Sequence, residues 1–151
     1  MREVSADVSR ERYDELSEQL RGLGVEIDED AALVLSEDGR YADSLLLRER
    51  GSGALTRVDT RDIISVESAG REIEVYTVHG VFTARERLYQ IQGRLDPEDF
   101  LRVSNGVIVA LRHIRSIKPA LSMRFTLTLS DGRRADVTRS CYYAFKEALG
   151  I

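Results

Sequence analysis

Two stretches of this sequence decide its fold: FLRVSNGVIVALRHI at Phe100–Ile114 and VTRSCYYAFKEALGI at Val137–Ile151. Each is an apolar segment with one or two polar residues at its edge. The residues of the first stretch that can form a core are Phe100, Val103, Val107, Val109 and Ile114. Burying unpaired polar or charged groups is costly. We therefore do not expect the same core to contain Arg102, Ser104, Asn105 and Arg139.

From Asp62 onward the pattern is strongly β, with short apolar or alternating runs between turn signals. The expected strands are Ile63–Glu67, Glu72–Thr77, Val81–Thr83, Leu101–Val103, Val107–Leu111, Ile114–Lys118, Met123–Leu129 and Arg133–Val137. Helical spacing predicts helices over Arg85–Leu95 and Ser140–Leu149, and Asp96-Pro97 fits the start of another helix. Many short strands predict a small sandwich rather than an α/β sheet.

The N-terminal third differs in composition. Helical spacing predicts a helix over Ser9–Leu23, followed by a strand at Ala32–Leu35 and a turn at Asp38-Gly39. Two further strands, Ser44–Arg48 and Ala54–Val58, flank a glycine-rich hairpin loop. We divide the chain into a small acidic α/β segment, residues 1–53, and a β-rich domain, residues 54–151.

The charge is unevenly distributed over this division. Residues 1–53 contain 7 Arg and 14 Asp or Glu, whereas residues 54–151 contain 15 Arg or Lys and 12 Asp or Glu. The overall net charge of −4 therefore hides a basic β-rich part. Thirteen of its 15 basic residues are Arg, which suits bidentate contacts with phosphates and guanine edges. A general surface preference for Arg is the alternative explanation.

Other features exclude several classes of protein. No apolar run approaches the ~18 residues of a membrane span, the N-terminus lacks an apolar signal core, and the single Cys141 excludes an internal disulfide framework. We expect a cytoplasmic protein. Two His and one Cys show no zinc spacing, and no phosphate-binding glycine motif is present. We expect no enzyme, cofactor, metal or small-molecule substrate; an enzyme that uses Cys141 with a histidine is the weakest alternative.

Three loops carry the side chains that could read nucleic acid. A β scaffold without a long recognition helix must present such side chains at the ends of its strands, and base edges require donors and acceptors of the Arg and Asn type. The candidate loops are Ala69–Arg71, Val103–Gly106 and Thr138–Ser140. Asn105 could pair with adenine and Arg139 with guanine. Asn105-Gly106 is also a common turn pair, so a simple turn remains an alternative.

From Asp62 to Ile151 the sequence resembles the LytTR DNA-binding domain family. The markers include Phe100-Leu101-Arg102-Val103, Ile108-Val109, Asp131-Gly132, and Val137-Thr138-Arg139 before the closing helix. The resemblance implies a mainly β fold: an elongated β-sandwich of short antiparallel strands with short helices, here preceded by the small α/β N-terminal segment. It also implies that loops of the sandwich reach two successive major grooves of double-stranded DNA.

Matching the family pattern places its DNA contacts near Arg71 and on Asn105 and Arg139, with Ser104 beside them. Two positions depart from the pattern: Gly106 stands where a Ser is usual, and Ala110 stands where an Asn is common. Altered sequence preference is the expected consequence. The basic residues that could contact phosphates are Arg102, Arg112, Arg115 and Lys118. Arg102 has a rival role in holding the loop from beneath.

We therefore expect a short, stand-alone, sequence-specific bacterial transcription regulator without a receiver domain. The resemblance implies a homodimer on repeated sites and a small membrane protein as a controlling partner. The Ser9–Leu23 helix would support self-association or a partner surface, unless it packs on the strands of its own segment. The alternative function is a protein-interaction or regulatory module of the same fold that has lost specific DNA binding.

Overall fold

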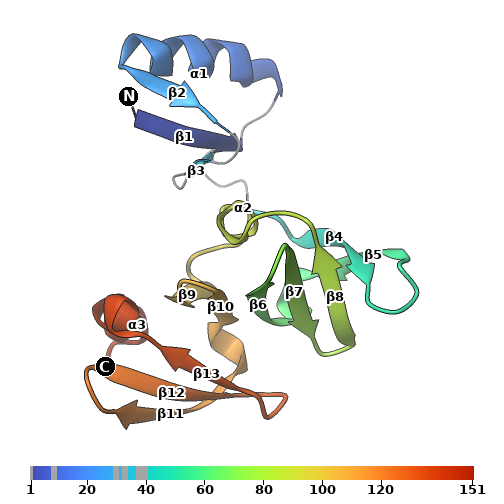
Figure 1. Ribbon diagram of the computed structural model, residues 1–151, viewed down its shortest axis with the longest axis vertical. Coiled ribbons are helices and arrows are strands. Elements are labelled where there is room, and N and C mark those ends of the chain that lie inside the picture. The colour runs from blue at the N-terminus through green and yellow to red at the C-terminus, as the bar shows by residue number, and fades with distance from the viewer. Residues whose placement is uncertain (1, 8–9, 29–30, 32–33, 37–40) are drawn as a thin grey trace.

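The computed structural model describes residues 2–7, 10–28, 31, 34–36 and 41–151. Its described part contains three sheets; Figure 1 shows the N-terminal sheet at the top, the large sheet in the middle and the third sheet below, next to β9 and β10. The fold is mainly antiparallel β, as the sequence predicts, with a small α/β unit at the N-terminus.

The N-terminal unit is a parallel three-stranded sheet with one helix. Its elements are β1 (Arg2–Asp7), α1 (Arg10–Gly22), β2 (Val25–Ile27) and β3 (Val34–Ser36), and the sheet order is β2-β1-β3. The helix α1 confirms the predicted helix and connects the parallel strands β1 and β2, which suits a right-handed βαβ crossover. Leu16 and Leu20 on α1 are half-buried. The predicted turn at Asp38-Gly39 lies outside the described residues.

The large sheet has seven antiparallel strands in the order β5-β4-β8-β7-β6-β10-β9. They are β4 (Ser44–Glu49), β5 (Leu55–Asp59), β6 (Ile63–Ala69), β7 (Glu72–Thr77), β8 (Gly80–Ala84), β9 (Phe100–Ser104) and β10 (Val107–Ala110). The β4–β5 hairpin confirms the loop predicted at Gly51–Gly53. Since β4 pairs with both β5 and β8, the expected division between residues 53 and 54 falls inside this hairpin.

The third sheet completes the sandwich. It contains β11 (Ile114–Ala120), β12 (Arg124–Leu129) and β13 (Arg134–Val137) in sequence order, and α3 (Tyr142–Leu149) follows. In Figure 1 this sheet and α3 lie beside β9 and β10. The Ser130–Gly132 turn that joins β12 and β13 was predicted from its Asp-Gly pair.

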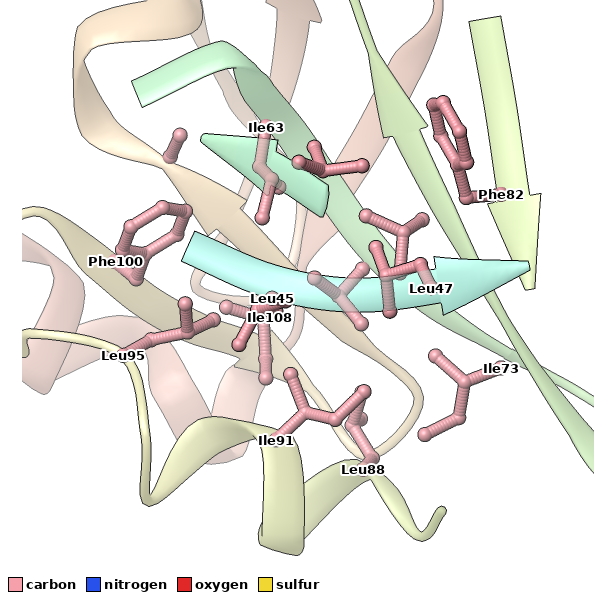
Figure 2. Packing of buried hydrophobic residues seen from close by; sticks show 14 residues of the cluster. Leu45, Leu47, Ile63, Ile73, Phe82, Leu88, Ile91, Leu95, Phe100 and Ile108 are labelled. Atoms are coloured by element: carbon pink, nitrogen blue, oxygen red, sulfur yellow. The ribbon is translucent and has the colours of Figure 1, made fainter. Parts of the chain in front are cut away.

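Two hydrophobic cores lie on opposite faces of β6, β9 and β10. The first packs β4, β5, β7 and β8 with α2 (Leu88–Gln92), as Figure 2 shows for Leu45, Leu47, Ile91 and Ile108. The second contains Ile64, Val103 and Val109 together with Leu127 and Phe145. A strand covered on both faces buries consecutive residues. This explains why Ile63, Ile64, Ser65 and Val66 at the start of β6 are all buried.

The region before β9 differs from the prediction. The expected helix over Arg85–Leu95 is reduced to α2, because Arg85–Arg87 form an irregular connection after β8 ends at Ala84, and Gly93 follows the last turn of α2. Leu88, Ile91 and Leu95 are nevertheless buried together. The helix start expected at Asp96-Pro97 is wrong: the Asp96 carbonyl accepts the Phe100 N–H, which closes a turn directly before β9.

None of the helices in the described part of the chain is both long and apolar enough to cross a membrane.

Candidate nucleic-acid interface

Two of the three candidate loops lie side by side at one end of the large sheet. β6 pairs with β10 so that Val107 lies opposite Glu67. Just beyond this pair, a tight turn follows β6 and another tight turn precedes β10. The Ser68 N–H donates to the Gly106 carbonyl at 2.8 Å. The turn after β6, which contains Arg71, therefore adjoins the turn before β10, which contains Asn105.

The third loop is attached to the same end from the other sheet. The Thr138 N–H donates to the Val103 carbonyl at 2.9 Å. Arg139 follows at once and opens the short 3₁₀ helix Arg139–Cys141, directly beside the β9–β10 turn. The structure thus brings together Arg71, Asn105 and Arg139, which lie far apart in the sequence.

The side chains of the predicted contact residues at this end are exposed to solvent. Arg71, Asn105 and Arg139 are all exposed. Within the part of the chain that the structure describes, neither guanidinium makes a hydrogen bond or an ion pair. Ser104 is partly buried, and its Oγ accepts a long hydrogen bond from the Gly106 N–H at 3.4 Å. Free guanidinium and amide groups are the groups that can bond to phosphates and base edges.

Arg102 holds the β9–β10 turn from beneath. Its Nε donates to the Ser104 carbonyl at 2.9 Å, one Nη donates to the Asn105 carbonyl, and the other donates to Oε1 of Gln92 at 2.9 Å. Burial lowers the pKa of Arg102 below its ordinary value. Because all three nitrogens are occupied inside the protein, this geometry favours the rival structural role. Sequence reasoning missed Gln92, which only the packing of α2 brings close.

The remaining predicted cations are spread over the molecule. Arg112 lies on the 3₁₀ helix after β10, at the end opposite the Asn105 turn, and its Nη2 is 3.7 Å from the Asp99 carboxylate. Arg115 lies near that same far end, because the carbonyl of His113, two residues earlier, accepts the Ser130 N–H of the β12–β13 turn. Lys118 lies on β11, opposite Thr126 of β12, and is nearer to the end of the sheet that carries Arg139.

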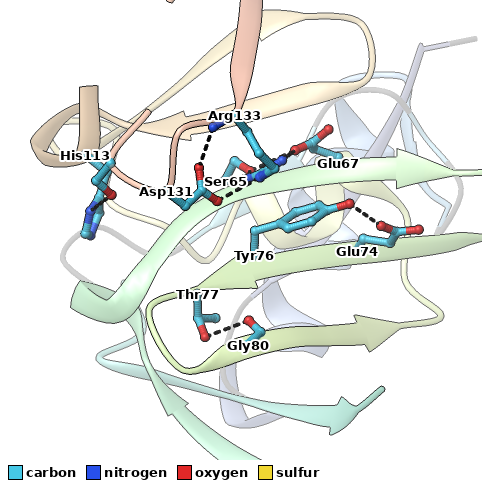
Figure 3. Close-up of polar contacts among 10 residues, drawn as sticks. Ser65, Glu67, Glu74, Tyr76, Thr77, Gly80, His113, Asp131 and Arg133 are labelled. Carbon is cyan, nitrogen blue, oxygen red and sulfur yellow. Dashed lines mark hydrogen bonds and ion pairs between the residues drawn. The ribbon is translucent and has the colours of Figure 1, made fainter. Parts of the chain in front are cut away.

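A polar network fastens the β12–β13 turn to the large sheet (Figure 3). Arg133 donates to Oδ2 of Asp131 at 2.7 Å, to Oγ of Ser65 at 2.6 Å, and to Glu67. Its guanidinium carbon lies 3.5 Å from the ring centroid of Tyr76, whose hydroxyl donates to Glu74 at 2.5 Å.

These contacts change the pKa of Arg133. Burial alone would lower the pKa of Arg133, but its bonds to Asp131 and Glu67 outweigh burial and raise the pKa.

The geometry gives no support to thiol chemistry. His113 contacts Ser130 Oγ at 2.8 Å and the Arg61 carbonyl at 3.2 Å, and His79 lies 3.3 Å from Asp62. None of these contacts involves Cys141, whose Sγ lies 3.9 Å from the Ser140 hydroxyl. Among the described residues, no group of His, Cys, Asp and Glu is placed to hold a metal ion.

Comparison with known proteins shows which family the β-rich part matches. The LytTr DNA-binding domain family matches residues 53–150. The sensory transduction protein LytT of Bacillus subtilis is 27% identical over 119 residues, which is 79% of this chain and 49% of LytT. The CO-responsive transcriptional regulator RcoM of Rhodospirillum rubrum is 39% identical over 69 residues, 45% of this chain and 29% of RcoM. The chain thus spans half or less of the length of these relatives.

A solved LytTr DNA-binding domain from Bacillus cereus has the same fold. It superposes with a TM-score of 0.68 at 22% identity, and the match covers 73% of this chain and 99% of that domain. The family match extends over most of the chain and includes all three loops described above. The chain therefore belongs to the LytTr DNA-binding domain family.

Proposed function

We propose that this chain is a sequence-specific bacterial transcription regulator that reads the major groove through the three adjoining loops. One observation carries the proposal: Arg71, Asn105 and Arg139 lie at one end of the sandwich with exposed side chains. Arg can bond bidentately to guanine and Asn to adenine. The family is one of DNA-binding domains and not of enzymes, and the relatives named above are regulators.

Hydrogen bonds within the protein hold the loops in place without DNA. Arg102 bonds two carbonyls of the Asn105 turn, and backbone hydrogen bonds join all three loops. A preformed loop loses less conformational entropy on binding. We infer that Arg102 positions the Asn105 turn, while Arg71, Asn105 and Arg139 contact DNA. Ser104 lies beside them, and Lys118 is placed to approach a flanking phosphate.

The test begins with selection of bound duplexes from a random pool. Affinity for the selected duplex should fall as salt rises. Asn105→Ala and Arg139→Ala should each weaken binding by ~1–3 kcal/mol and relax preference at one base pair. Arg57→Ala is the matched control, because Arg57 is exposed on β5 at the far edge of the large sheet. Failure to select any sequence would sink the proposal.

The second candidate is an interaction module of the same fold that has lost specific DNA binding. The acidic N-terminal segment and the departures at Gly106 and Ala110 motivate it. Ala110 is 1% exposed in the first core, at the end of β10 away from the turn. A buried alanine there removes no group from the loops. Only Gly106 removes a hydroxyl from the loops. The same selection experiment decides between the two functions.

Further expectations accompany the main proposal. We propose that two copies occupy repeated sites, that the protein acts in the cytoplasm, and that a small membrane protein controls it. The N-terminal unit is the proposed partner surface: Leu16 and Leu20 of α1 are half-buried, while Tyr13 and Leu23 remain exposed. Sedimentation with and without a two-site duplex tests the first point, since a monomer under both conditions contradicts it.

A further inference from the structure

An arginine-lined hollow adjoins the proposed interface. It lies between the β6–β7 turn and the segment that joins β8 to α2, with a volume of about 430 Å³. Ile73 pairs with Ala84, so the residues after β8 return to the turn that holds Arg71. The hollow is lined by three arginines, Arg71, Arg85 and Arg87, together with Glu72, Glu86 and Ser68. Sequence reasoning missed Arg85 because only the β7–β8 pairing brings it to this end.

The charge balance of the hollow favours an anion. Glu86 is already paired with Arg94 at 2.5 Å, which leaves Glu72 as the only lining carboxylate that forms no ion pair with another described residue. Arg71 and Arg85 are exposed, and their guanidinium groups have no hydrogen bond or ion pair to other described residues. Arg71 and Arg85 therefore face one glutamate, Glu72.

We propose that this hollow binds a backbone phosphate of the DNA, with Arg85 and Arg71 as its donors. Arginine pairs bidentately with phosphate. The hollow is open and polar, which suits a phosphate on a long strand better than an enclosed small ligand. It lies beside Arg71, so the DNA contact continues from the Asn105 turn across β6, β7 and β8. This inference rests on the proposed function and adds a contact outside the three loops.

The experiment compares Arg85→Ala with Arg57→Ala in the full chain on the selected duplex and on an unrelated duplex. Loss of one phosphate contact should reduce the slope of log affinity against log salt by about 0.9, which is about eightfold in affinity at 0.1 M relative to 1 M salt. The loss should be equal for both duplexes, because a phosphate contact carries no sequence information. Arg57→Ala should leave both the slope and the affinity unchanged.

Three other outcomes would overturn the inference. An Arg85→Ala slope equal to that of Arg57→Ala removes the hollow from the interface. A loss confined to the selected duplex makes Arg85 a base contact instead. If the native chain binds no duplex, the proposed function fails. In that case pyrophosphate, added during NMR of the Gly70 and Arg71 amides, shows whether the hollow binds free phosphate only, which also overturns the DNA assignment.

Discussion

Replacement of Arg133 by alanine should lower the free energy of unfolding by about 2–3 kcal/mol. Arg133 bonds two carboxylates and one hydroxyl and covers the ring of Tyr76. A hydrogen bond to a charged group contributes ~1.5–3 kcal/mol, and removing one partner of a fully buried pair costs ~3–5 kcal/mol. The Arg133 and Glu67 side chains are each 29% exposed, so solvent screens part of this interaction. The expected loss therefore falls below the fully buried value.

The structural reason for the loss is that the network joins two sheets. Arg133 belongs to the β12–β13 connection, while Ser65 and Glu67 belong to β6 of the large sheet. Without Arg133, Glu67 and Asp131 lose their common partner, although Ser65 still donates to Glu67 at 2.9 Å. Arg133→Lys keeps the charge but cannot reproduce the planar fork of donors, so it should recover only part of the loss.

Urea unfolding followed by far-UV circular dichroism measures the effect. Arg134→Ala is the matched control: Arg134 is the next residue, it is exposed, and the described part of the chain offers its side chain no hydrogen bond or ion pair. Its change should stay within about 0.5 kcal/mol. The slope with urea should be unchanged in both variants. If Arg133→Ala and Arg134→Ala agree within about 0.5 kcal/mol, the network does not fasten the sheets and the reasoning is refuted.

Three further predictions concern acid, the second core and the turns. Burial would raise the pKa of Asp131, but bonds from Arg133 outweigh it and hold the pKa below the ordinary 3.8. The stabilisation by the ionised Asp131 is therefore present above about pH 4 and is lost as the pH falls through its lower pKa in the folded state. The free energy of unfolding, measured with urea, should fall between pH 5 and pH 3, and this fall should be smaller in Arg133→Ala than in the native chain. Phe145→Ala should cost ~3–5 kcal/mol by urea unfolding, since Phe145 is fully buried against Phe125, and a change under 1 kcal/mol would contradict the second core. Gly70→Ala should cost ~1 kcal/mol because Gly70 has a φ of +65°, whereas Gly106→Ala should be tolerated because its Cβ would meet only Ser68 Cβ at 3.8 Å; equal effects would refute this.

Local patterns in the sequence predicted most of the strands. The alternation in Glu72–Thr77 places Ile73 and Val75 inward, and the structure buries both. Asp131-Gly132 predicted the last hairpin for a local reason, since a turn depends on a few adjacent residues. The helix expected over Arg85–Leu95 was too long, because the spacing of Leu88, Ile91 and Leu95 shows which residues are buried but not where α2 begins and ends.

The site could be predicted only in part. Exposed polar residues at strand ends pointed to three loops that the structure brings together, and the family pattern selected Arg71, Asn105 and Arg139 among them. Their closeness depends on long-range pairings, such as Ser68 with Gly106 and Thr138 with Val103, which no local pattern encodes. For the same reason the sequence could not show that Arg112 lies near Asp99 at the far end.

The double burial of β6, β9 and β10 explains how two sheets can present one interface. Ile108 packs into the first core while its neighbour Val109 packs into the second, so β10 belongs to both. Close-packed cores resist small displacements. Asn105, carried by the large sheet, and Arg139, carried by the small one, are therefore fixed relative to each other through β9 and the Thr138–Val103 hydrogen bond. Arg133 fixes the other end of the small sheet, so a change far from the loops can alter their spacing without touching DNA.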